Sequence, residues 1–390
     1  MTDGRHALLA GLLALAALPS LATPLVIGVV QRANDDRLAP ARLASAYPGH
    51  PGGPLQPGVA LAIADARLAL TSAQRTARIE AVELSDGEAP QAALQRLQQA
   101  GAVALIADLP APQLKALAAA TPLPVFNAGA ADDALREADC RPNLWHTLPS
   151  ERMRADALAQ WLVARRWQRV LLLHGSSAAD AERRATAQAS LQRHGLKVVA
   201  ARPFKLSADP RERALANPLL LTGGIEHDAV WVVDSDGEFA RGLPYRTALP
   251  RPVVGDAGLL ALAWAPHHER NGAPQLARRF ERLAGRPMTA PDWAAWMAAK
   301  AIVQAALERT STGAPTFGLD GFKGPRLSFR AWDRQLRQPL LLTDGQGVAG
   351  LAPVDGVLHP RDVMDTLGAD EGERRCTAAG AAAAGAKGQP

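Results

Sequence analysis

The apolar and polar positions between residues 141 and 175 predict a helix followed by a buried strand. Ser150 marks the helix start, because its hydroxyl can accept a hydrogen bond from a free amide of the first turn. Apolar residues then recur at helical spacing and can share one buried stripe: Met153, Ala157, Leu158, Trp161 and Leu162. The uninterrupted apolar run 170–173 is typical of a parallel strand covered on both faces. This stretch therefore leads from one βα lobe into a second.

The same alternation of strand and helix patterns continues on both sides of this stretch. Short apolar or alternating runs predict strands at 24–30, 79–84, 103–107, 124–127, 170–173, 197–201, 229–233 and 251–256. Helical periodicity predicts helices at 58–68, 89–100, around Leu114 and Leu117, and at 178–194, 275–284 and 292–309. Strands that alternate with helices in this way form parallel, doubly wound sheets.

Two regions depart from this alternation. Residues 31–58 form a long segment rich in Pro, Gly and charge, and a loop of this length inside a compact domain is usually functional or mobile. From Gly318 onward the pattern changes to short strands at 326–330 and 338–345, with Asp344-Gly345 as a hairpin signal.

The predicted fold class is therefore α/β, with two doubly wound parallel-sheet lobes, a hinge and a cleft between the lobes. The first lobe is expected to comprise residues 24–145 and 258–320. The second is expected to comprise 146–257 and 321–376, including the C-terminal strands. Residues 377–390 have no core-forming pattern and are expected to be a disordered tail.

Composition and charge fit an exported globular protein. Of the 390 residues, 48% are hydrophobic and 21% charged, which is ordinary for a soluble domain. The net charge of +5 is spread over interleaved acidic and basic residues, whereas nucleic-acid binding needs a basic stripe. Arg5 and His6, the apolar run 7–18 and the small residues Ser20 and Ala22 predict residues 1–22 to be a signal peptide cleaved near Ala22. The run is too short for a membrane anchor.

Export determines how the only two cysteines are interpreted. In an oxidising compartment Cys140 and Cys376 are most simply a disulfide, which would tie the C-terminal end to the region between the lobes. The alternative is a pair of free, buried thiols, and the sequence alone does not separate the two.

The order of these local patterns resembles the type I periplasmic binding proteins, the group that contains the leucine/isoleucine/valine-binding components of ABC transporters. The resemblance covers nearly all of the chain after the predicted signal peptide. It rests on these segments in this order: PLVIGVV, GVALAIADA, AVALIAD, PVFNAGA, HTLPSERMRADALAQWL and RVLLLHG. It implies a periplasmic solute-binding protein, without catalytic residues or cofactors, that acts with a membrane permease and is expected to be a monomer.

Later segments resemble one branch of this group, linked with PQQ-dependent alcohol dehydrogenase systems. They are NGAPQLARRFERLAGRPMTAPDWAAWMAAKAI, GFKGPRLSFRAWDRQLRQPLLL and HPRDVMDTLGADEGERRC. The implication is a role beside quinoprotein alcohol oxidation. No pattern in the chain indicates that PQQ itself is bound.

In such folds the ligand lies between the lobes, at the carboxyl ends of the strands. The resemblance therefore places these ligand contacts: Asp108, Asn127, Ser176, Asp234 and Asp236, with Asp256 behind them. Amino-acid binders carry small hydroxyl residues where this chain has Asp108, Pro110 and Ala111. Three aspartates would repel a free carboxylate and favour a cation, a polyol or a metal-bearing ligand. The alternative is that each aspartate caps a turn or helix.

The sequence disfavours three other functions. A hydrolase is disfavoured because Gly175-Ser-Ser-Ala-Ala lacks the second glycine of a nucleophile elbow. A metal site is disfavoured because the adjacent His267, His268 and Glu269 cannot face one ion from a helix. No nucleotide-binding glycine motif follows any predicted strand. A ligand sensor or accessory protein of the same fold stays open, because both kinds of protein close around a ligand.

Overall fold

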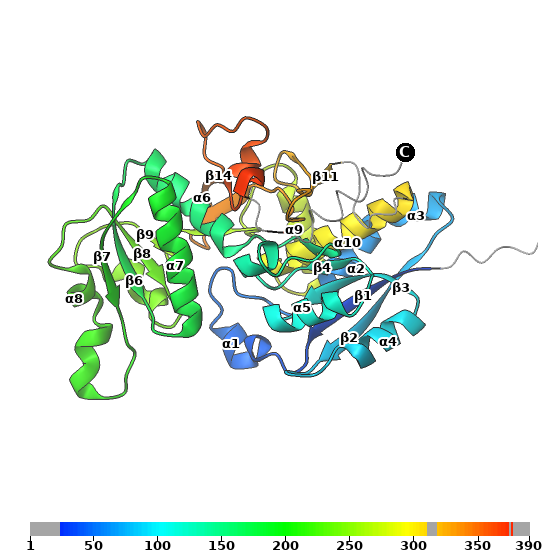
Figure 1. The fold of residues 1–390 in the computed structure, drawn as a ribbon, viewed down its shortest axis with the longest axis horizontal. Helices are drawn as coiled ribbons and strands as arrows, with labels where there is room; N and C mark the ends of the chain where they lie inside the picture. Colours follow the sequence, from blue (N-terminus) through cyan, green and yellow to red (C-terminus); the bar gives the residue numbers. More distant parts are fainter. Residues whose placement is uncertain (1–23, 310–317, 374–375, 377–390) are drawn as a thin grey trace, which may run out of the picture.

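Two parallel sheets form the centres of two lobes that lie side by side (Figure 1). The structure is a computed structural model that describes residues 24–309, 318–373 and 376. The first sheet has the order β2-β1-β3-β4-β5 and the second has the order β7-β6-β8-β9. The predicted α/β class with two doubly wound lobes is confirmed. The predicted signal peptide (1–22) and C-terminal tail (377–390) lie outside the described residues.

The first sheet consists of five parallel strands: β1 (Leu25–Arg32), β2 (Ala77–Leu84), β3 (Ala102–Asp108), β4 (Val125–Asn127) and β5 (Leu144–His146). The helices of this lobe are α1 (Pro40–Ala44), α2 (Gln56–Asp65), α3 (Arg67–Ser72), α4 (Gln91–Gln99), α5 (Ala111–Ala119), α9 (Ala273–Ala284) and α10 (Ala290–Glu308). β5 and α1 were not predicted, because three-residue and five-residue elements carry little periodicity.

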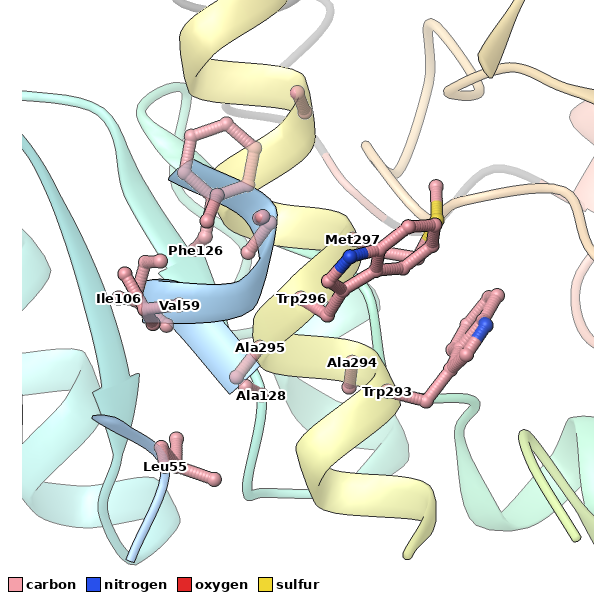
Figure 2. Packing of buried hydrophobic residues seen from close by; sticks show 14 of the residues in the cluster. Leu55, Val59, Ile106, Phe126, Ala128, Trp293, Ala294, Ala295, Trp296 and Met297 are labelled. Carbon is pink, nitrogen blue, oxygen red and sulfur yellow. The ribbon is translucent and has the colours of Figure 1, made fainter. Parts of the chain in front are cut away.

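Successive residues of β1 face opposite sides of the sheet and enter different cores. Val26 and Val30 pack with the apolar faces of α4 and α5. Ile27 and Val29 pack with α2 and α10. Figure 2 shows the buried side chains of α10 near Val59 of α2 and Ile106 of β3. The two tryptophans of α10, Trp293 and Trp296, are fully buried.

The second sheet is covered in the same way. Its strands are β6 (Arg169–His174), β7 (Lys197–Pro203), β8 (Ala229–Val233) and β9 (Val253–Gly255), and its helices are α6 (Glu151–Ala164), α7 (Ala178–Arg193) and α8 (Pro218–Thr222). Ser150 caps α6 as predicted, with its hydroxyl accepting from the Met153 amide at 3.2 Å. Short 3₁₀ helices complete the chain: Asp36–Leu38, Asp133–Arg136, Pro210–Ala216, Ala240–Tyr245, Val363–Thr366 and Glu371–Glu373.

A small antiparallel sheet, β10-β13-β14, packs against α6. Its strands are β10 (Leu260–Leu262), β13 (Leu340–Thr343) and β14 (Val348–Ala352). The turn at Asp344 and Gly345 joins β13 to β14, so the predicted hairpin is confirmed. A two-residue pair, β11 (Leu319–Asp320) with β12 (Arg326–Leu327), stands where a strand over 326–330 was expected. Bends at 322–325 precede β12, and a turn at 331–333 follows the expected range.

Within residues 24–309 and 318–373 the chain passes between the two lobe cores three times. Leu148 belongs to the first core and Met153 to the second. Ala261 lies in the second core, while Ala263 lies in the first. The third passage runs from Leu336 in the first core to Leu340 in the second. These three passages connect the two lobe cores.

A disulfide joins Cys140 and Cys376, with their Cα atoms 5.5 Å apart and a sequence separation of 236. The predicted bridge is confirmed. It fastens the C-terminal end of the described chain to the loop before β5, which lies directly ahead of the first passage between the lobes.

Candidate functional site

Loops at the carboxyl ends of β1 and β8 line one pocket of about 300 Å³, which we call the cleft pocket. Each lobe contributes polar side chains to it. Its lining residues are Asp36, Arg37, Arg42, Ser45, Tyr47, Gly49, His50, Pro51, Ser235, Asp236 and Arg241. This is the place where doubly wound folds bind ligands, because loops and helix amides converge beyond the strand ends.

On the first lobe an arginine neutralises the predicted contact Asp108. Arg37 Nη2 donates to Asp108 Oδ2 at 2.9 Å and to Asp35 Oδ2 at 2.6 Å. Asp35 caps the 3₁₀ turn that carries Arg37, which fixes the guanidinium above the end of β3. Although burial opposes it, bonding to the two carboxylates raises the pKa of Arg37. Asp108 thus lies behind Arg37, and the guanidinium faces the cleft pocket.

Asn127 shapes the neighbouring loop from inside. Its side chain is fully buried, and Oδ1 accepts from the amides of Gly129 and Ala130 at 3.1 and 2.8 Å. Nδ2 donates to the Ala130 carbonyl oxygen at 2.7 Å. Gly129 has to be glycine, since a Cβ there would lie 2.0 Å from Asp108 Oδ1. All these Asn127 contacts lie within the protein, so its described role is to hold the loop after β4.

On the second lobe the predicted residues separate into buried and exposed groups. Asp234 is buried, and its Oδ2 accepts from the Ala240 amide at 2.7 Å, as a turn-capping aspartate does. Asp236 is exposed and lines the cleft pocket. Ser176 is exposed beyond β6, while its neighbour Ser177 is the actual cap of α7.

Behind this wall, a smaller pocket of about 50 Å³ holds compensated charge. Arg183 bonds Asp256, and its Nε lies 3.4 Å from Glu151 Oε2. Asp256 Oδ2 also accepts from the Asp234 amide at 2.7 Å. Burial raises the pKa of Asp256 despite Arg183, whereas Arg183 and Arg154 lower the pKa of Glu151 against its burial. The carboxylates of this wall therefore bond to protein groups.

The Asp234 carboxyl should make stability depend on pH. Burial and the nearby charge of Asp236 raise its pKa to about 6, above the ordinary value of 3.8. Between these values the folded state holds a proton that the unfolded state has lost, so this group's contribution falls as pH rises through 6. We expect Asp234→Asn to gain melting temperature relative to the wild type between pH 4 and pH 7.5, measured by differential scanning calorimetry. A pH-independent difference would contradict this assignment, and Asp236→Asn should reduce the pH-dependent step.

The structure thus brings together only some of the predicted contacts. Asp236 lines the cleft pocket, Asp108 and Asp234 lie behind its walls, Asn127 is internal, and Ser176 lies outside the residues that line it. The ten other lining residues were not among the predicted contacts, and they include Arg37, Tyr47, Ser235 and Arg241. The length of segment 31–58 was the only signal for the first two, since it marked a functional loop without naming its residues.

Two features, a metal-binding cluster and a membrane-spanning helix, are absent from the part of the chain that the structure describes. No group of three or more His, Cys, Asp or Glu side chains there could hold a metal ion. None of the helices within 24–309 and 318–373 is long and apolar enough to cross a membrane.

Solved structures identify the fold as that of the type I periplasmic binding proteins. A branched-chain amino acid ABC transporter periplasmic ligand-binding protein from Burkholderia xenovorans LB400 matches with a TM-score of 0.69 at 13% identity, covering 91% of this chain and 100% of that one. An ABC transporter solute-binding protein from R. palustris in complex with benzoate matches with a TM-score of 0.64 at 16% identity, over 91% and 99% of the two chains. An ABC transporter substrate-binding protein from Desulfitobacterium hafniense in complex with Leu matches with a TM-score of 0.59 at 16% identity, covering 83% of this chain and 98% of that one.

Sequence comparison agrees over part of the chain. Residues 48–215 match the family model described as periplasmic binding protein. A search of curated proteins finds no match. The family and the matched structures are described as binding proteins rather than enzymes, in agreement with the prediction that this protein has no catalytic activity.

Proposed function

We propose that this protein is a periplasmic solute-binding component of an ABC transporter, which closes its lobes around a small ligand and presents it to a membrane permease. The observation that carries the proposal is the cleft pocket, because both lobes supply its polar wall at the carboxyl ends of their parallel strands. Such a protein works through the different affinities of its open and closed states. We place the hinge at the three passages, near residues 148–153, 261–263 and 336–340.

We propose a small carboxylate as the ligand. The cleft pocket is lined by three arginines, Arg37, Arg42 and Arg241, against the two carboxylates Asp36 and Asp236. Arg37 offsets part of the negative charge of Asp108 and Asp35, and the guanidinium groups of the lining arginines match carboxylates in geometry and charge. The ligands named in two matched structures, benzoate and Leu, also carry a carboxylate. Oxidation of an alcohol leads to a carboxylic acid, so this ligand class is consistent with a role beside PQQ-dependent alcohol oxidation. That role rests on the sequence resemblance.

A thermal-shift panel followed by calorimetric titration tests this function. The panel contains benzoate and other small carboxylates, the matching alcohols, amino acids, polyols and Ca²⁺. A ligand at 100 times its Kd stabilises the folded state by about 2.7 kcal/mol, which raises Tm by a few degrees. We expect carboxylates to bind and their alcohols not to bind. A panel without any response, or a response to Ca²⁺ alone, would contradict the proposed ligand class.

The predicted contacts are tested with the carboxylate that binds best in the panel. Asp108→Ala with Asp234→Ala should weaken its affinity at least tenfold, because both aspartates position groups of the pocket wall. The matched control is Asp139→Ala with Asp209→Ala, which removes one aspartate from each lobe away from the residues that line the cleft pocket. Unchanged affinity in the first pair would refute the site.

A further inference from the structure

Residues 45–51, which follow α1, cross from the first lobe to touch the second. Arg241 Nη2 donates to the Ser45 carbonyl oxygen at 2.6 Å. The Tyr47 ring lies against Gly237, in the loop after β8. Figure 1 shows α1 between the two lobes, next to the side that carries α7. The segment therefore bridges the lobes at the mouth of the cleft pocket.

The residues of the second lobe that pack against this segment include two glycines, Gly237 and Gly345. A Cβ on Gly237 would lie 2.8 Å from Tyr47 Cε1 and 3.1 Å from two further ring carbons. A Cβ on Gly345, in the β13–β14 turn, would lie 2.4 Å from Pro48 Cγ. Both glycines have positive φ, +72° and +90°, so each is also favoured by its backbone. Two separate loops of the second lobe thus fit the same short segment closely.

Tyr47 also faces the polar groups of the opposite wall. Burial raises the pKa of Tyr47, and the charges of Asp256, Asp234 and Asp236 raise it further while Arg183 opposes them. The hydroxyl accordingly stays protonated and can serve as a hydrogen-bond donor beside carboxylates. A bulky, neutral side chain therefore lines this part of the cleft pocket.

We infer that residues 45–51 form a latch between the lobes, in which Tyr47 seated on Gly237 holds the cleft closed. The latch contacts join groups on opposite sides of the three passages, so a hinge opening at those passages separates them. The ring and the Ser45–Arg241 bond shift the equilibrium toward the closed state by their own contact energy. The inference rests on the proposed function, since a latch has a role only in a protein whose lobes open.

The test measures the distance between lobes without any ligand. Spin labels at A119C on α5 and A181C on α7 report this distance by double electron–electron resonance, and the disulfide keeps both native cysteines unlabelled. We expect Tyr47→Ala to raise the ratio of long to short distances about tenfold, the effect of losing one buried contact set. Arg241→Gln should act in the same direction, and Tyr47→Phe should act less, since it keeps the ring.

A matched glycine pair separates the ring contact from backbone strain. Gly237→Ala strains φ and displaces Tyr47, whereas Gly224→Ala strains an equal φ of +70° in the same lobe where a Cβ meets nothing within 4 Å. Of the two glycine variants, only Gly237→Ala should lengthen the distances between the spin labels. In the Tyr47→Ala background, Gly237→Ala should cause no further lengthening. Distance distributions of Tyr47→Ala and Gly237→Ala that superpose on the wild type would overturn the latch. A silent ligand panel would instead overturn the proposed function, because the latch measurement uses no ligand.

Discussion

Replacing Arg37 by methionine should destabilise the protein by about 3 kcal/mol and abolish carboxylate binding at neutral pH. Arg37 is the described partner of Asp108, which is only 7% exposed and whose Oδ1 already has no hydrogen-bond partner. Removing the guanidinium leaves a buried charge uncompensated, a loss that typically costs about 3–5 kcal/mol when both partners are buried. Because the Arg37 side chain is partly exposed, we expect the loss of stability to lie at the lower end of this range. Urea denaturation followed by circular dichroism measures the change.

A second substitution separates stability from binding. In Arg37→Met with Asp108→Asn the charge of Asp108 is removed while Asp35 keeps its own, so we expect part of the stability to return while carboxylate affinity stays low. The exposed Arg42, which lines the same pocket, provides the control, and Arg42→Met should change stability by less than about 0.5 kcal/mol. If Arg37→Met were as stable as the wild type, the ion pair with Asp108 would not hold this wall together.

The local patterns predicted most of the two sheets, because apolar runs and capping residues act over a few positions. Ser150 was identified as a helix cap from the polar–apolar boundary alone, and its hydrogen bond to Met153 follows from that local geometry. The run 170–173 became β6 for the same reason. The small sheet was harder: β10 pairs with β13, some 80 residues later, and three-residue strands have almost no period of their own.

The candidate site was predicted less well, because its chemistry depends on pairs that are distant in sequence. Asp108 and Arg37 are 71 residues apart, and only the tertiary fold brings the charge and its compensation together. Asp108, Asp234 and Asp236 together predicted a cation, a polyol or a metal-bearing ligand, but in the structure Asp108 is paired with Arg37, whose side chain lines the cleft pocket. The same holds for Asp256, whose partner Arg183 lies on a different element. A carboxylate identified from sequence therefore locates a charged group, but it does not give the net charge that the site presents to a ligand once an arginine pairs with it.

The three passages between the lobes present a similar case, since a buried lysine connects all of them. Lys323 is fully buried, and its Nζ donates to the Ala263 carbonyl oxygen at 2.9 Å and to Gln338 Oε1 at 2.7 Å. Gln338 Nε2 donates in turn to the Thr147 carbonyl oxygen at 2.8 Å. Ala263, Gln338 and Thr147 belong to or adjoin the three different passages. Nothing in the local sequence around Lys323 distinguishes it from a surface lysine.

Lys323→Met should therefore destabilise the protein by about 3 kcal/mol and broaden the distance distribution between the lobes. The substitution leaves the Ala263 carbonyl oxygen and Gln338 Oε1 without this donor, and each buried unsatisfied group costs about 1–3 kcal/mol. Lys300→Met is the matched control, because Lys300 also lies over a tryptophan of α10 and donates to a backbone carbonyl but bonds none of the passages. Equal effects of the two substitutions would show that Lys323 has no special role at the hinge.

The pH dependence of this loss gives an independent check. Burial holds the pKa of Lys323 well below its ordinary value of 10.5, so at neutral pH the unfolded chain binds a proton that the folded chain binds less well. Stability from this group therefore rises as pH increases toward 10.5 and is lost as pH falls through the lowered folded pKa. The stability deficit of Lys323→Met should grow between pH 7 and pH 9.5, while that of Lys300→Met should change less. A deficit that shrinks over this range would mean that the folded state stabilises the charged ammonium and that the hinge holds a cation.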